Sequence, residues 1–176
     1  MTPAHARSLN SDDVSAVAPD PGAPEHLPDH PRGSVPDDGC MDIDKALDFV
    51  RVNHKAVLAT LKKDGTPALS PMTVGVDDDG HVVISTRQTA YKVRHIRRDP
   101  RVWLAVLPEG FFGDWVQIEG TAEIVDLPEA MEGLVDYYRR ISGEHPDWDD
   151  YRAAMVRDQR CLLRITLAKA GPNVSG

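Results

Sequence analysis

The chain of 176 residues has only two cysteines and no long apolar run. Cys40 and Cys161 lie 121 positions apart, and neither belongs to a CxxC motif or a Cys/His cluster. This spacing argues against a disulfide framework and against a structural zinc site. No apolar stretch approaches the roughly 18 residues that a membrane-spanning helix requires. The length suits one domain, and we expect no membrane partner and a cytoplasmic location.

Positive charge is also scarce over most of the chain. There are 20 Lys and Arg residues against 28 Asp and Glu, which gives a net charge of −8. Proteins that bind nucleic acid normally carry a basic surface, so we expect no nucleic acid as a partner. One segment departs from this average. Residues 86–101 contain six basic residues and His95 against a single acid, Asp99.

The first 40 residues contain no aromatic side chain, yet they hold 7 of the 14 prolines and 7 acids against 2 basic residues. Such a segment cannot bury enough apolar surface to offset the entropy of ordering it. We therefore expect residues 1–40 to be a disordered acidic extension, although a functional tail has the same composition. The folded domain is expected over 41–176. Residues 1–18 lack the basic and apolar regions of a signal peptide, so export is not expected.

Hydrophobic periodicity in the folded part predicts short strands joined mostly by turns. The expected strands are 56–61, 66–76, 81–85, 102–107, 115–125 and 160–167. The expected helices are 43–53, 89–98, 128–142 and 149–157. There is no regular βαβ alternation and no GxGxxG or GxxxxGK[ST] motif, which argues against a doubly wound parallel sheet. The pattern favours a mainly β, α+β fold: a small antiparallel barrel of six strands with peripheral helices.

The basic segment is the strongest candidate for a binding site. Ser85, Thr86 and Arg87 are expected where a strand ends. The following helix would direct its unpaired N–H groups and the positive end of its dipole toward the same place. Lys92 would add a point charge there, and a guanidinium suits a phosphate. The segment therefore predicts a phosphate site, with a solvated basic helix face as the alternative.

Residues for acid–base or nucleophilic catalysis are not grouped in the sequence. His54, His81, His95 and His145 are scattered, and no nucleophile accompanies them, so we expect no catalytic side chain of that kind. The acidic run 77–79 lacks the Glu that an EF-hand needs at its twelfth position. We expect turn and capping roles for these acids and no metal site.

Three segments, taken in order, resemble a known family. They are K-A-V-L-A-T-L at 55–61, K-D-G-T-P-A-L-S-P-M at 63–72, and V-V-I-S-T-R-Q-T-A-Y-K-V-R-H-I-R-R-D-P-R-V at 82–102. Over residues 43–168 the chain is similar to the flavin and deazaflavin split-barrel family typified by pyridoxamine 5′-phosphate oxidase. The similarity is strongest to the actinobacterial branch that uses coenzyme F420.

The resemblance implies a six-stranded antiparallel Greek-key split β-barrel that forms a homodimer, with cofactor sites across the subunit interface. It also implies a set of cofactor-binding residues: Ser70, Met72 and Thr73 beside the ring, Ser85, Thr86, Arg87 and Lys92 around the phosphate, and Gln117 after the loop that carries Phe111, Phe112 and Trp115. That loop would lie near the substrate, or it would serve core or dimer packing. The chain departs from the family at His95, where members often have Asn.

The choice of cofactor depends on the tail of the ligand. F420 carries extra carboxylates beyond its phosphodiester, and Arg94, Arg97 and Arg98 exceed what FMN needs. We therefore predict an F420-dependent oxidoreductase that transfers a hydride between the reduced deazaflavin and a small unsaturated organic substrate. Solvent, Tyr91 or Lys92 would supply the proton. The alternatives are an FMN-dependent enzyme of the pyridoxamine phosphate oxidase type and a non-catalytic protein that binds F420 or haem.

Overall fold

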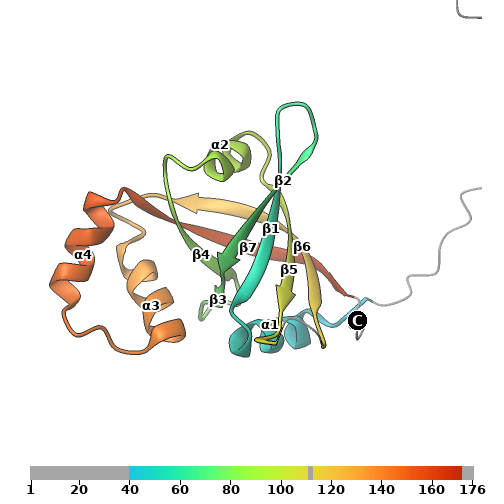
Figure 1. The fold of residues 1–176 in the computed structure, drawn as a ribbon, viewed down its shortest axis with the longest axis horizontal. Helices are drawn as coiled ribbons and strands as arrows, with labels where there is room; N and C mark the ends of the chain where they lie inside the picture. The colour runs from blue at the N-terminus through green and yellow to red at the C-terminus, as the bar shows by residue number, and fades with distance from the viewer. Residues whose placement is uncertain (1–39, 111–112, 172–176) are drawn as a thin grey trace, which may run out of the picture. The chain divides into compact units, whose positions relative to one another are not determined.

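The computed structural model describes residues 40–110 and 113–171, and Figure 1 shows their arrangement. The strands are β1 (Lys55–Leu61), β2 (Pro67–Thr73), β3 (Gly75–Val76), β4 (Val82–Arg87), β5 (Arg101–Leu107), β6 (Val116–Val125) and β7 (Arg160–Gly171). The helices are α1 (Ile43–Val52), α2 (Tyr91–Arg98), α3 (Met131–Ser142) and α4 (Trp148–Arg157). All strands pair antiparallel in one sheet of order β2-β1-β5-β6-β7-β4-β3.

The described sheet has seven strands, not the six expected, because the strand predicted at 66–76 is interrupted at Val74. β2 pairs with β1, whereas β3 pairs with β4. Val74 is fully buried, and its N–H donates to the carbonyl oxygen of His54 at 2.9 Å. A single residue thus connects the two edges of the sheet, which is possible only if the sheet curls back on itself. The curled antiparallel sheet with its helices is consistent with an α+β split barrel.

The inside of the curled sheet is an apolar core whose largest fully buried side chains come from five strands: Leu58, Ile84, Leu104, Ile118, Leu163 and Ile165. Helices α1 and α2 lie at opposite ends of it (Figure 1). Asp42 caps the N-terminus of α1, because its carboxylate oxygen accepts from the N–H of Asp44 at 2.8 Å. The apolar face of α1 closes one end of the core through Ala46, Leu47 and Val50.

Helices α3 and α4 form a second core against the outer face of β4 and β7. Leu134 and Met155 pack there with Val83 and Leu162. The predicted helix at 128–142 begins three residues later than expected, because Pro128 lies in a turn in which the N–H of Met131 donates to its carbonyl oxygen at 3.1 Å. This second core attaches the helical pair to the strand that carries the predicted phosphate residues.

Some expectations fall outside the described residues. The predicted disorder of the N-terminal extension concerns residues 1–39, and Phe111 and Phe112 of the predicted substrate loop also lie outside. Among the helices that are described, none is long and apolar enough to cross a membrane.

Candidate functional site

The two strands that carry most of the predicted cofactor residues meet where the sheet splits. The β3–β4 ladder pairs Gly75 with Val83. If that register continued, Thr73 would lie opposite Ser85, but β2 leaves the ladder there and pairs with β1. β2 and β4 nevertheless stay in contact. The structure therefore brings the end of β2 close to the Ser85–Arg87 end of β4.

The predicted residues of β2 and β4 do not all face the same way, because side chains alternate along a strand. Ser70 and Met72 are half-buried, whereas Thr73 lies on the opposite, exposed face. On β4, Arg87 is exposed but the side chain of Thr86 is only 5% exposed. The hydroxyl of Thr86 is thus turned into the core and is not offered to solvent.

Arg87 has a neighbour that the sequence did not reveal. It lies opposite Arg160 in the β4–β7 ladder, and Asp158 is close to both. The Nη2 of Arg87 is 3.2 Å from the Asp158 carboxylate, and that of Arg160 is 3.6 Å from the same oxygen. Within the described residues the buried Nε of Arg160 has no hydrogen-bond partner. Two guanidinium groups therefore share one carboxylate.

Helix α2 begins close to this pair of arginines and has an open N-terminus. Its N-cap position is Ala90, and no side chain of the described chain caps its first N–H groups. Lys92 lies in the first turn, and no salt bridge to it is found among residues 40–110 and 113–171. An uncapped helix N-terminus beside a lysine favours an anion.

The charges around Cys161 show which groups gather at this end of the core. Burial, with a smaller contribution from Asp126, raises the pKa of the Cys161 thiol to about 11. Arg97, Arg160 and Lys92 act in the opposite direction. Three cations from α2 and β7 therefore lie near one point, and a thiol with such a pKa is not a nucleophile at neutral pH.

Arg94, Arg97 and Arg98, the basic residues beyond those that FMN would need, have different surroundings. Arg97 forms an ion pair with Asp126 at 3.0 Å. The guanidinium of Arg94 lies over the ring of Tyr91 at 4.9 Å, and Arg98 donates to the carbonyl oxygen of Leu61. Arg97 is thus partly neutralised, whereas neither of the contacts of Arg94 and Arg98 removes positive charge.

His95 points inward from α2. Its Nδ1 lies 3.0 Å from the hydroxyl of Thr60, which is one of two buried polar residues of the described chain. Burial lowers the pKa of His95, and the positive charges of Arg98, Lys62 and Arg94 lower it further. The imidazole therefore fastens α2 to β1, which gives a structural role to the position where this chain departs from its family.

Gln117 lies far from Arg87 of the predicted phosphate site within one chain. It pairs with Gly171 at one end of β7, whereas Arg87 pairs with Arg160 at the other end. At about 3.3 Å per residue, this places Gln117 roughly 30 Å or more from Arg87. Within a single chain the two residues cannot contact the same small ligand.

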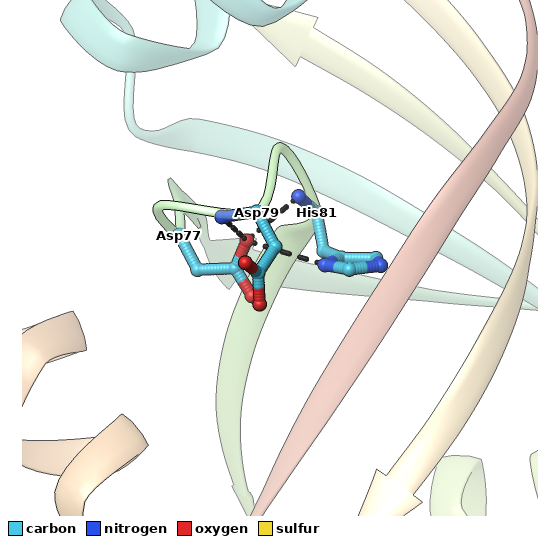
Figure 2. Close-up of side chains that lie close together, drawn as sticks. All are labelled: Asp77, Asp79 and His81. Atoms are coloured by element: carbon cyan, nitrogen blue, oxygen red, sulfur yellow. Dashed lines mark hydrogen bonds and ion pairs between the residues drawn. The ribbon is translucent and has the colours of Figure 1, made fainter.

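A second group of polar residues lies at the β3–β4 turn. Asp77, Asp79 and His81 each offer one ligand atom within 4.8 Å of the others (Figure 2). Arg164 already pairs with Asp77 at 3.0 Å and with Asp79 at 2.8 Å. Burial opposes ionisation of Asp77, but hydrogen bonds from His81 and Arg164 outweigh it and lower its pKa. The arginine supplies the cation that balances these acids, and the group stabilises the turn.

The outer face of β2, β1 and β5 is apolar and open. Leu69 is 69% exposed. A shallow groove beside it is lined by residues of the three strands, among them Val57, Pro71 and Leu107. Exposed apolar patches of this kind on a sheet are typical of protein contacts.

The curled antiparallel sheet, with a cluster of basic side chains at one end, is consistent with a split barrel. The comparison with known families agrees. A model described as pyridoxamine 5′-phosphate oxidase matches residues 43–172. The chain belongs to the pyridoxamine 5′-phosphate oxidase-like family of flavin and deazaflavin split-barrel proteins, as its resemblance predicted.

Solved structures show the same fold. The chain is 29% identical to the conserved hypothetical protein Rv2991 from Mycobacterium tuberculosis, with a TM-score of 0.62 over 74% of this chain and 82% of that one. It is 19% identical to an F420 reductase, with a TM-score of 0.56 over 70% and 94% of the two chains. HutZ, the heme storage protein from Vibrio cholerae, is 14% identical, with a TM-score of 0.58 over 77% and 98%. At such identities the last two similarities show the fold alone.

Proposed function

We propose that the chain is an F420-dependent oxidoreductase of the cytoplasm that acts as a homodimer, with residues 41–176 as its cofactor-binding domain. It would transfer a hydride between the reduced deazaflavin and a small unsaturated organic substrate. The observation that carries the proposal is the uncompensated positive charge at the split of the sheet. Arg87 and Arg160 share the carboxylate of Asp158 there, and Lys92 acts on the same end of the core without a salt bridge among the described residues.

The residues of this site fit a phosphorylated cofactor. The buried Nε of Arg160 has no partner in the described structure, and α2 starts without a side-chain cap. Both features leave hydrogen-bond donors available near positive charge, which is what a phosphate requires. A cofactor with its phosphate here would extend its ring along the neighbouring strand β2, which presents Thr73 on one face and Ser70 and Met72 on the other.

The protein's own contribution is binding, orientation and exclusion of water. When bound, the deazaflavin supplies the hydride chemistry. Arg87 and Lys92 would hold the phosphate, so that the ring lies in a fixed position against β2. The proton would come from solvent, because Tyr91, the nearest hydroxyl of α2, is 74% exposed and covered by Arg94 rather than directed into a closed site.

The preference for F420 over FMN rests on the cations beyond the phosphate site. F420 carries carboxylates on its tail, and FMN ends at one phosphate. Arg94 and Arg98 have no carboxylate partner among the residues described, so they can meet the extra negative charges. Similarity to an F420 reductase supports this choice, while the family as a whole keeps FMN as the alternative.

The proposed homodimer explains two features of the single chain. The exposed apolar face around Leu69 and Pro71 would be covered by a second copy. Gln117, which is too far from Arg87 in its own chain, could then contact the cofactor held by the partner subunit. A non-catalytic protein that carries F420 or haem is the second candidate, favoured by the similarity in fold to HutZ.

The test is a comparison of cofactor affinities. Titration of the purified protein with F420 should quench or shift the cofactor's fluorescence, whereas FMN should bind more weakly. Co-purification of FMN would favour the oxidase alternative. If F420 binds but no substrate oxidises its reduced form, the carrier alternative holds. Affinity for neither cofactor would refute the proposal.

A charge variant tests the placement of the phosphate. Lys92→Ala should weaken F420 binding by roughly 1–3 kcal/mol, the range for a lost charge-assisted hydrogen bond. Lys63→Ala, in the exposed turn between β1 and β2, is the matched control and should leave the affinity unchanged. Equal affinities of the two variants would remove Lys92 from the site.

A further inference from the structure

Tyr137 of α3 reaches the place where the sheet splits. Its hydroxyl donates to the carbonyl oxygen of Thr73 at 2.9 Å. Hydrogen bonding from the backbone of Ser85 acts on the same phenol. Its ring lies against Gly75, since a Cβ at that glycine would be 3.7 Å from the Tyr137 Cδ2. One side chain thus touches the end of β2, the start of β3 and the middle of β4.

The hydroxyl replaces a backbone hydrogen bond that β2 and β4 do not form with each other. Thr73 and Ser85 would face each other if the register of Gly75 and Val83 continued. In an antiparallel ladder, facing residues can exchange N–H and C=O hydrogen bonds, but β2 turns away before this pair forms. A tyrosine hydroxyl can donate to a carbonyl and accept from an N–H at the same time. It can therefore hydrogen-bond to both strands at the point where they no longer pair with each other.

The phenol stays protonated in this role. Burial raises the pKa of Tyr137 to about 12, which outweighs the lowering contributions of the Ser85 backbone and Arg160. At neutral pH the hydroxyl consequently keeps the proton that it donates to Thr73. The proximity of Arg160 also shows that Tyr137 lies next to the cationic site.

We propose that Tyr137 is a positioning residue that sets the separation between Thr73 and Ser85, and so between the ring-binding and phosphate-binding parts of the cofactor site. The inference rests on the proposed function, because those two strands are its ring and phosphate contacts. A ligand that spans both parts must match their separation. A ligand that touches only the ring part does not depend on it.

The test is the variant Tyr137→Phe, which lacks only the hydroxyl oxygen. Tyr137→Phe keeps the ring against Gly75 and loses the bridge. Tyr151→Phe is the matched control, because its hydroxyl donates over the same 2.9 Å to a backbone carbonyl in the same helical core, that of Leu134, which belongs to α3 and to neither separated strand. Both variants should lose similar thermal stability, so a difference between them in binding reports on position rather than on folding.

The binding readout uses F420 and its phosphate-free deazaflavin riboside, measured by fluorescence titration. Tyr137→Phe should weaken F420 about fivefold or more while changing the riboside less than about twofold, the scale of one hydrogen bond. Tyr151→Phe should change neither. If the wild-type protein prefers FMN, then FMN and riboflavin are the corresponding pair. Equal losses for both ligands, or no loss for either, would overturn the inference.

A second readout needs no cofactor. Hydrogen exchange of the Ser85 amide in the ligand-free protein should be about tenfold faster in Tyr137→Phe than in Tyr151→Phe, because its local protection is lost. A wild-type protein that binds neither cofactor would refute the proposed function, and the exchange rates alone would then decide whether Tyr137 joins the strands. Equal exchange rates at Ser85 in the two variants would show that it does not.

Discussion

Arg87 and Arg160 lie opposite each other across the β4–β7 ladder, with the carboxylate of Asp158 within 3.2 Å of the first and 3.6 Å of the second. Two guanidinium groups on one carboxylate leave an excess positive charge. The Nε of Arg160 is buried and has no hydrogen-bond partner in the part of the chain that the structure describes. Buried donors in native proteins nearly always have a hydrogen-bond partner. This exception therefore indicates that the Nε of Arg160 donates to a bound ligand.

Replacement of Arg160 tests that interpretation. Arg160→Gln should weaken F420 binding by roughly 1–3 kcal/mol, because a charged donor to the phosphate is lost. The loss should be larger at low salt than at high salt, since added ions screen the remaining attraction. Fluorescence titration at the two salt concentrations measures both effects. Arg157→Gln, on the exposed end of α4, is the control, and an equal affinity in the two variants would exclude Arg160 from the site.

Much of this site was predictable from local sequence, and the rest was not. The strand end at Ser85–Arg87 and the helix that carries Lys92 follow from periodicity and charge, and the structure has both. Arg160 could not be found in this way, because its closeness to Arg87 depends on the pairing of two strands whose facing residues here are 73 positions apart. The same holds for Tyr137, whose hydrogen bond to Thr73 joins residues 64 positions apart.

The strand count shows a similar limit. Residues 66–76 have one continuous strand pattern, but Val74 is the point where the chain passes from one sheet edge to the other. The strand breaks there because the whole sheet curls, and a local sequence pattern does not show that curl. Likewise, alternation along β2 puts Thr73 on the face opposite Ser70 and Met72, a distinction that the family resemblance did not make.

Gly120 should tolerate no side chain. It lies at the bulge where the β6–β7 register shifts, and a Cβ there would be 2.5 Å from the carbonyl oxygen of Thr166. Because that contact is with backbone, the strands would have to move apart. Gly120→Ala should lower the free energy of unfolding by roughly 1–3 kcal/mol, as other forced overpacking does. Urea denaturation measures this.

Gly110→Ala is the matched control for that measurement. A Cβ at Gly110 would meet no atom of the described residues within 4 Å, so this variant should unfold at nearly the wild-type urea concentration. A Gly120→Ala protein as stable as the control would mean that β6 and β7 are less closely packed than the structure shows.

The apolar face around Leu69 should hold the dimer together. Leu69 is 69% exposed in the single chain, so Leu69→Asp should not damage the fold of a monomer. In a dimer the same change would bury an unpaired carboxylate, which costs several kcal/mol. We expect sedimentation velocity to show a shift from dimer to monomer, accompanied by weaker F420 binding.

Val156→Asp provides the comparison, because Val156 on α4 is also an exposed apolar residue, at 60%. It lies on the helical pair, away from the proposed interface, and should change neither assembly nor binding. A wild-type protein that sediments as a monomer would contradict the dimer directly.

Acid should weaken the fold through His95. Burial, together with Arg98, Lys62 and Arg94, lowers the pKa of His95 below its ordinary value of 6.5. In the unfolded chain the imidazole therefore takes up a proton at a higher pH than in the folded protein. The stability that depends on the neutral imidazole is complete above about pH 6.5 and is lost as the pH falls toward the folded-state pKa.

His95→Gln should remove that part of the pH dependence. Urea unfolding at a series of pH values should give a smaller loss of stability below pH 6.5 for the variant than for the wild type, because glutamine does not titrate. Arg98→Gln should lose an amount of stability below pH 6.5 that lies between those of the wild type and His95→Gln. The reason is that the loss of one nearby charge brings the pKa of His95 closer to its ordinary value. NMR titration of the imidazole measures that shift directly. If the wild type and His95→Gln lose stability in parallel below pH 6.5, His95 is not the group responsible.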